Sequence, residues 1–166
     1  MCLTPGWAGQ DIEVTGNERP ATPAEDAVVH VMLRQDAQGA GDARAAARRV
    51  LGGWRIPTTT VENVVLAVSE LVTNAIRYGS SPVELTLSRK AHEVRVDVHD
   101  DGMARIDVAP RQTVASEAVS GRGFAIVTAL ADKVGCDNPK GRRGKSVYAT
   151  FLLPAVVLTT GLQHLS

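Results

Sequence analysis

One long amphipathic helix followed directly by two alternating strands constrains this chain most. In residues 61–79, VENVVLAVSELVTNAIRYG, apolar side chains recur at helical spacing until Gly79 ends the pattern. Pro82 then introduces the segment 83–90, and the segment 93–102 carries valines at every second position. A helix with one apolar stripe beside locally paired strands predicts a layered fold, and argues against a doubly wound parallel sheet.

Weaker patterns extend this layered fold in both directions. Asp42 is the expected N-cap of the first helix, and Pro154 ends the last strand. The short segment KVGCDN is expected only to connect the last helix to the final turn. The predicted elements are strands at 27–36 and 146–153 and helices at 41–54 and 124–133. We therefore expect an α/β two-layer sandwich, in which about three helices cover one face of a mixed, mostly antiparallel sheet.

Length and composition set the domain organisation. A chain of 166 residues is long enough for one domain, which we place at 27–154. Residues 1–26 are rich in Gly, Pro, Thr and acids without periodicity, so we expect a disordered leader there, and 155–166 form a C-terminal tail.

Charge and cysteine content exclude several classes of function. Lys plus Arg and Asp plus Glu both number 18, so no net field draws the chain to nucleic acid or to an anionic membrane. Cys2 and Cys136 lie far apart without metal-ligand spacing, which favours a reducing compartment. The first twenty residues show no basic patch followed by an apolar core, and no apolar run is long enough to span a membrane, so we expect a cytoplasmic protein.

The long helix carries a polar pair, Glu70 and Asn74, about 40° apart on one face. The simpler interpretation is a solvated face opposite the apolar stripe. The functional interpretation is chemical: an amide oxygen suits Mg²⁺ already neutralised by phosphates, and a nearby carboxylate can accept a proton from an attacking hydroxyl.

The segment HDDGMA at the end of the alternating strand is a second candidate. The carboxylate of Asp100 can accept a hydrogen bond from a base amino group, and the missing side chain of Gly102 leaves room for a ring. Asp-Gly is also a common turn dipeptide, and an ordinary turn is the alternative.

The third candidate is GRGFAIVTALADKVG, in which Gly121, Arg122 and Gly123 open a helix. Exposed amides and the helix dipole favour phosphate there, and the arginine adds a cation. A flexible hinge is the alternative. The segment GRRGKS at 141–146 is not a phosphate loop, because Pro139 replaces the first glycine of that motif and a strand, not a helix, follows.

Together these motifs resemble the GHKL-type (Bergerat fold) ATPase domain shared by type II topoisomerases, heat-shock chaperones, histidine kinases and mismatch-repair ATPases. VSELVTNAIRYG resembles its Asn-containing box, VHDDG its adenine box, GRGFAIVTALADKVG its glycine-rich box and GKSVYATFLLP its closing strand. The resemblance covers about residues 27–154 and is greatest to the bacterial anti-sigma factor and serine-protein kinase branch.

The resemblance implies a role for each motif residue. Glu70 would be the general base and Asn74 the Mg²⁺ ligand. Asp100 would read adenine above the turn at Gly102. Phosphates would lie at Gly121, Arg122 and Gly123, and Ser146 would help to hold the network on the adenine side.

The resemblance further implies ATP and Mg²⁺ as ligands and serine phosphorylation as the activity. The implied partners are a sigma factor and a serine-bearing antagonist protein, and a homodimer is one possible assembly. The alternative is a non-catalytic nucleotide-sensing or protein-docking module. Ala104 favours that alternative, because it stands where the family often has a second glycine.

Overall fold

The computed structural model describes residues 26–102, 122–138 and 141–154. The predicted leader, apart from Asp26, the tail at 155–166 and the loop that contains Ala104 lie outside these residues. The elements, in chain order, are β1 (Ala27–Leu33), α1 (Gly39–Gly53), α2 (Thr58–Tyr78), β2 (Val83–Lys90), β3 (Glu93–Asp100), α3 (Arg122–Leu130), β4 (Lys133–Asp137) and β5 (Lys145–Leu152).

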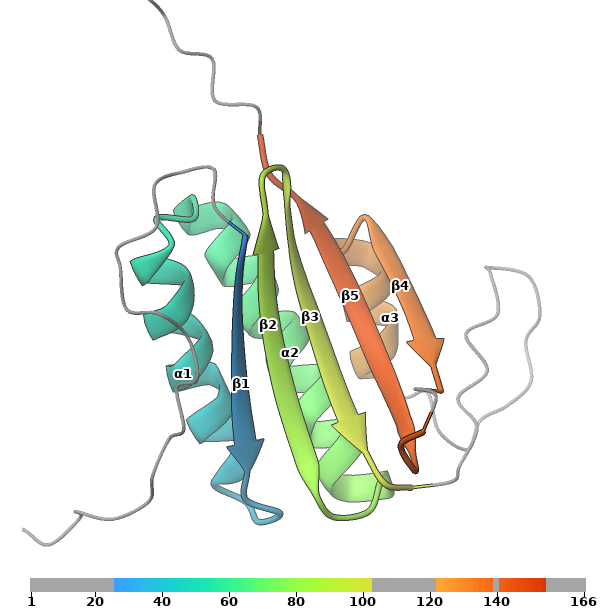
Figure 1. Ribbon diagram of the computed structural model, residues 1–166. Coiled ribbons are helices and arrows are strands. Elements are labelled where there is room, and N and C mark those ends of the chain that lie inside the picture. The colour runs from blue at the N-terminus through green and yellow to red at the C-terminus, as the bar shows by residue number, and fades with distance from the viewer. Residues whose placement is uncertain (1–25, 103–121, 139–140, 155–166) are drawn as a thin grey trace, which may run out of the picture.

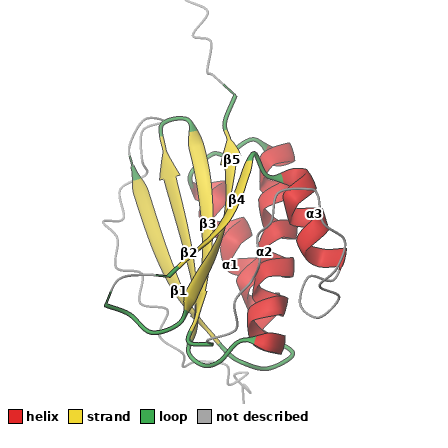
Figure 2. Cartoon of the chain, turned by 90° about the vertical axis from the view of Figure 1, so that its right-hand side faces the viewer, coloured by secondary structure: helices red, strands yellow, loops and turns green. Residues whose placement is uncertain are grey.

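The strands form one sheet in the order β1-β2-β3-β5-β4 (Figure 1). All four strand pairings are antiparallel. The sheet was predicted to be mixed and mostly antiparallel, and its described strands are all antiparallel to their neighbours. The three helices cover one face of this sheet (Figure 2), which confirms the predicted two-layer sandwich. None of these helices has the length and apolarity needed to cross a membrane.

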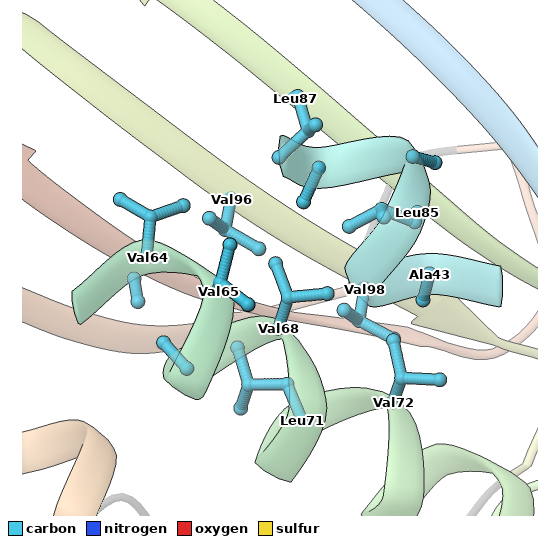
Figure 3. Packing of buried hydrophobic residues seen from close by; sticks show 14 of the residues in the cluster. Ala43, Val64, Val65, Val68, Leu71, Val72, Leu85, Leu87, Val96 and Val98 are labelled. Carbon is cyan, nitrogen blue, oxygen red and sulfur yellow. The ribbon is translucent and has the colours of Figure 1, made fainter. Parts of the chain in front are cut away.

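The core lies between α2 and the central strands (Figure 3). Val64, Val68 and Val72 of α2 have no exposed surface, as their helical spacing predicts. The alternating valines of β3 point to the same core, and Val94, Val96 and Val98 are no more than 1% exposed. Burial of each such side chain stabilises the fold by about 1.5–3 kcal/mol.

The N-terminus of α1 corrects the predicted cap. The helix begins at Gly39, and the carboxylate of Asp36 accepts hydrogen bonds from the backbone N–H groups of Gln38 (2.9 Å) and Gly39 (3.2 Å). The hydrogen bond from Gln38 is the main cause that lowers the pKa of Asp36. Asp42 is not the N-cap. It lies in the first turn of α1, where its negative charge interacts favourably with the positive end of the helix dipole.

The segment after α3 also differs from the prediction. The helix ends at Leu130 rather than at residue 133, and Lys133 already pairs with Thr150 as the first residue of β4. Asp132 fixes this change of direction, because its carboxylate accepts a hydrogen bond from the backbone N–H of Leu152 at 2.8 Å. Pairing with β5 therefore makes KVGCD a strand instead of a connection.

Candidate functional site

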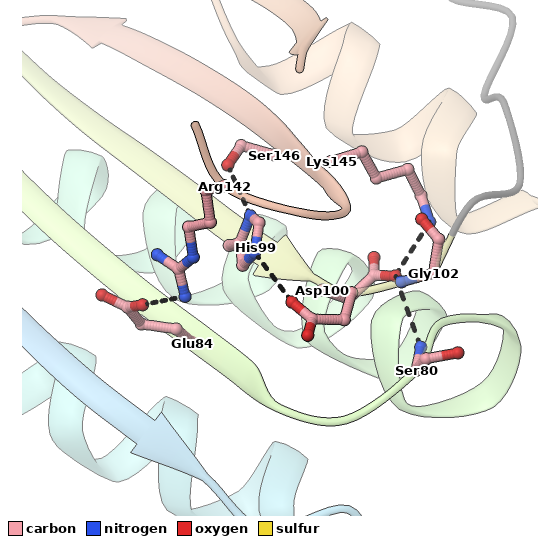
Figure 4. A network of polar contacts seen from close by, with 9 residues as sticks. Ser80, Glu84, His99, Asp100, Gly102, Arg142, Lys145 and Ser146 are labelled. Carbon is pink, nitrogen blue, oxygen red and sulfur yellow. Dashed lines mark hydrogen bonds and ion pairs between the residues drawn. The ribbon is translucent and has the colours of Figure 1, made fainter. Parts of the chain in front are cut away.

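The carboxylate of Asp100 is the centre of a buried polar cluster where β3 ends (Figure 4). Its Oδ1 accepts a hydrogen bond from the Nζ of Lys145 at 2.9 Å and from the backbone N–H of Gly102 at 2.8 Å. The backbone N–H of Ser80 donates to the same oxygen at 3.4 Å. Asp100 is only 2% exposed, so these donors hold a charged group in a site nearly free of bulk water.

Two glycines enclose this carboxylate. A Cβ at Gly102 would lie 2.6 Å from the Oδ1 of Asp100 and 3.2 Å from the Cα of Gly79. A Cβ at Gly79 would lie 2.6 Å from the same Oδ1. Both positions require glycine for space, so the tight approach of the C-terminus of α2 to the turn after β3 depends on them.

Lys145 is the residue of this cluster that the sequence motifs did not indicate. It is the direct partner of Asp100 in the β3–β5 register, so both side chains point to the helix-covered face. Gly144, immediately before it, has a φ of +94°, and a Cβ there would collide with the backbone oxygen of Asp100. The turn therefore brings Lys145 to Asp100 only because residue 144 is glycine.

Ser146 lies on the opposite face of the sheet. Its Oγ is 3.2 Å from the Nδ1 of His99, and the Nε2 of His99 is 3.3 Å from a carboxylate oxygen of Asp101. Successive residues of a strand point to opposite faces, so Lys145 and not Ser146 is the β5 side chain that contacts Asp100. The predicted place of Ser146 in the adenine-side network is thus not the place that the structure assigns to it.

The turn that carries Gly144 is held from the outer face of the sheet. Arg142 donates to the carboxylate of Glu84 at 2.6 Å, and the Nδ1 of His30 lies 2.9 Å from the other oxygen of Glu84. Partial burial acts to raise the pKa of Glu84, but the hydrogen bonds from Arg142 and His30 outweigh it and hold this pKa below its ordinary value. The ionised Glu84 therefore anchors the turn to β2.

The second part of the site lies between α2 and α3. The carboxylate of Glu70 packs against Gly123, and a Cβ at position 123 would collide with the Oε2 of Glu70. Both residues are half-buried, so Glu70 does not lie on the fully solvated face that was its alternative interpretation. Its carboxylate is beside the N-terminus of α3, where the backbone N–H groups of a helix favour anions.

Asn74 is placed between these two parts by helix geometry. It follows Glu70 by one turn of α2 and is half-buried. From Glu70 to Gly79, α2 rises by about 13 Å, so it connects the start of α3 with the Asp100 cluster. Gly121 lies outside the described residues, and of Arg122 the structure describes the helical backbone but not the side chain.

Comparisons with known proteins agree with this arrangement. Residues 33–151 match the family of Histidine kinase-like ATPase domains. The crystal structure of the RsbU and RsbW domains of Rv1364c from Mycobacterium tuberculosis has a similar fold, with a TM-score of 0.57 at 21% sequence identity. That match covers 76% of this chain and 32% of the other, so this chain spans about a third of the protein that it resembles. No curated protein matches it in sequence. Since the family match includes most of the sheet and all three helices, the chain belongs to the histidine kinase-like ATPase domain family.

Proposed function

We propose that this chain is an ATP-binding regulatory protein of the cytoplasm, an anti-sigma factor that phosphorylates a serine of an antagonist protein. The observation that carries the proposal is the position of the Glu70 carboxylate beside Gly123 at the start of α3. A base candidate and an anion-binding helix terminus lie next to each other there, as transfer of a phosphoryl group requires.

Each part of the site has a proposed task. Bound ATP would supply the γ-phosphoryl group, and the N-terminus of α3, with Gly121, Arg122 and Gly123, would bind its phosphates. Asn74 would complete the coordination of Mg²⁺ with a neutral oxygen ligand. Asp100 and the close backbone at Gly102 would bind the adenine end, because a carboxylate accepts a hydrogen bond from an amino group.

Glu70 would move the proton of the reaction. As the serine oxygen forms its bond to the γ-phosphorus, the bond from that phosphorus to the departing ADP oxygen breaks, and a carboxylate oxygen of Glu70 takes the serine proton. A positioned base of this kind contributes about 10²–10⁴-fold to the rate.

The proposed partners are a sigma factor and a serine-bearing antagonist protein. They rest on the similarity of the motifs to the anti-sigma and serine-kinase branch, and the likeness to the structure that contains an RsbW domain supports the same fold. The same similarity allows a homodimer as the assembly.

A non-catalytic nucleotide sensor is the second candidate. Ala104, outside the described residues, favours it because this chain has alanine where the family often has the second glycine of the adenine box. Such a protein would bind ATP but would not transfer phosphate to any partner.

Substitution of the base tests the proposal. Glu70→Gln keeps shape and polarity but cannot accept the proton, so single-turnover transfer from labelled ATP to a candidate antagonist should fall by about 10²–10⁴-fold. Nucleotide affinity, measured by calorimetry on the same preparations, should change little. Glu62→Gln is the matched control, since Glu62 is exposed on the same helix, and it should leave transfer unchanged. A normal rate in Glu70→Gln would exclude the catalytic role, and ATP binding without transfer by the unmodified protein would favour the sensor.

A further inference from the structure

We propose that Lys145 is a base-specificity residue, which donates a hydrogen bond to the N1 acceptor of adenine beside the contact that Asp100 makes with the 6-amino group. The proposal rests on the proposed function, because it takes Asp100 as the group that reads position 6 of the base. It adds a residue from β5 to the recognition of the nucleotide.

The hydrogen bonds within the pair support this role. All three donors to Asp100, from Lys145, Gly102 and Ser80, converge on Oδ1, and no described residue donates to Oδ2. The ammonium of Lys145 has three protons, and its acceptors among the described residues are the Oδ1 of Asp100 at 2.9 Å and the backbone oxygen of Gly102 at 3.5 Å. Among the described residues, the Oδ2 of Asp100 therefore keeps its capacity as an acceptor and Lys145 keeps one N–H as a donor, on side chains that are already in contact.

This pattern complements the Watson–Crick edge of adenine. Adenine presents an amino donor at position 6 and an acceptor at N1, whereas guanine presents an acceptor at position 6 and a donor at N1. With Asp100 opposite position 6, guanine would place an acceptor against the Oδ2 of Asp100 and a donor against the ammonium of Lys145, so one buried acceptor and one buried N–H would lack a partner, which is unfavourable.

Lys145 and Asp100 are both buried, which strengthens the hydrogen bonds that the Lys145 ammonium donates and restricts where this ammonium can lie. The side chains of Lys145 and Asp100 are 7% and 3% exposed, so solvent screens them little. The hydrogen bond to Asp100 holds the ammonium at 2.9 Å, and the close approach of Gly144 to the backbone of Asp100 holds the start of β5 beside it. A hydrogen bond from such a charged donor discriminates by about 10- to 100-fold.

Nucleotide analogues test this proposal on the unmodified protein. ATP is compared with 1-deaza-ATP, in which a C–H replaces the N1 acceptor, by calorimetry at equal Mg²⁺. We expect 1-deaza-ATP to bind about 10- to 100-fold more weakly than ATP, and GTP to bind more weakly still. Equal affinity for ATP and 1-deaza-ATP would overturn the role of Lys145 and leave the proposed function intact.

A variant then assigns the effect to the lysine. Lys145→Met removes the donor and should abolish the difference between ATP and 1-deaza-ATP, while Lys133→Met, which removes an exposed lysine of β4, should retain it. Tighter binding of ATP by Lys145→Met would show that the lysine competes with adenine for Asp100, and would overturn the proposal. Since this variant leaves Asp100 without its cation, its thermal unfolding is measured first, and the analogue comparison on the unmodified protein decides the proposal if the variant does not fold. Absence of binding of any nucleotide by the unmodified protein would overturn both this proposal and the proposed function.

Discussion

The carboxylate of Glu70 occupies the space that a Cβ at Gly123 would need. This contact joins the middle of α2 to the first turn of α3, although 53 positions separate the two residues in the printed sequence. It makes Gly123 a determinant of where the candidate base lies, independently of any role of its backbone in binding phosphate.

Gly123→Ala should therefore impair function more than stability. The added methyl group would displace the flexible end of Glu70, and alanine loses less backbone entropy on folding than glycine does. We expect an unchanged or slightly higher melting temperature together with slower phosphotransfer. Gly52→Ala is the control, because a Cβ at that helical glycine meets no atom within 4 Å. Equal transfer rates in both variants would contradict the positioning role of Gly123.

Asn74→Ala tests the metal ligand. If its amide oxygen completes the coordination of Mg²⁺, the variant should bind Mg-ATP about 10- to 100-fold more weakly, while ATP affinity in a chelator should stay the same. The control is Asn63→Ala, on the same helix but eleven residues earlier, which should not change either affinity. The same loss with and without Mg²⁺ would show that Asn74 does not act through the metal.

Gly144→Ala tests how the turn positions Lys145. Gly144 and Gly141 have φ values of +94° and +79°, and a non-glycine residue in such a conformation costs about 1–3 kcal/mol. Only at position 144 would the Cβ also collide with the backbone of Asp100, whereas at 141 it meets nothing within 4 Å. Chemical denaturation should therefore show a larger loss for Gly144→Ala than for Gly141→Ala. If both variants lost the same unfolding free energy, the positive φ alone would explain why residue 144 is glycine, and the contact with Asp100 would have no part in it.

The pH dependence of stability tests the anchor of this turn. The pKa of Glu84 is lower in the folded state than its ordinary value of 4.5, so its ionised form stabilises the fold above that value and this contribution is lost as the pH falls through the lowered pKa. Glu84→Gln should reduce the unfolding free energy at about pH 7 by about 1 kcal/mol or less, since Arg142 and His30 are half exposed and solvent screens the contacts.

As the pH falls through the lowered pKa of Glu84, the unfolding free energies of this variant and of the unmodified protein should converge, because the Glu84 side chain becomes uncharged, as the glutamine is at every pH. Glu93→Gln controls for removal of a carboxylate, as the oxygen of Glu93 lies 4.0 Å from the Nζ of Lys90. A difference between the two proteins that does not shrink as the pH is lowered would contradict the ionic role of Glu84.

The sequence predicted correctly those helices and strands in which apolar residues recur at the spacing of the element itself. The strand at 83–90 has the predicted bounds, because strict alternation begins directly after Pro82. The apolar stripe of α2 is buried as its spacing indicates, with Val68 fully enclosed. In contrast, the burial of β4 does not alternate clearly, and Gly135 lies tightly against the ring of Tyr148. That strand exists because β5 offers it a partner, which no local pattern contains.

The sequence by itself determined which residue types are available to the site and which helix or strand end carries them. It placed Glu70 and Asn74 on one helix, and Asp100 with Gly102 where a strand ends. Only the tertiary structure decided which side chains meet. The register of β3 against β5 brings Lys145 to Asp100 and turns Ser146 toward His99, since a shift of one residue along a strand exchanges its two faces. The packing of α3 on α2 likewise decides that Glu70 meets Gly123, because contacts between distant segments depend on how whole faces bury their apolar surface.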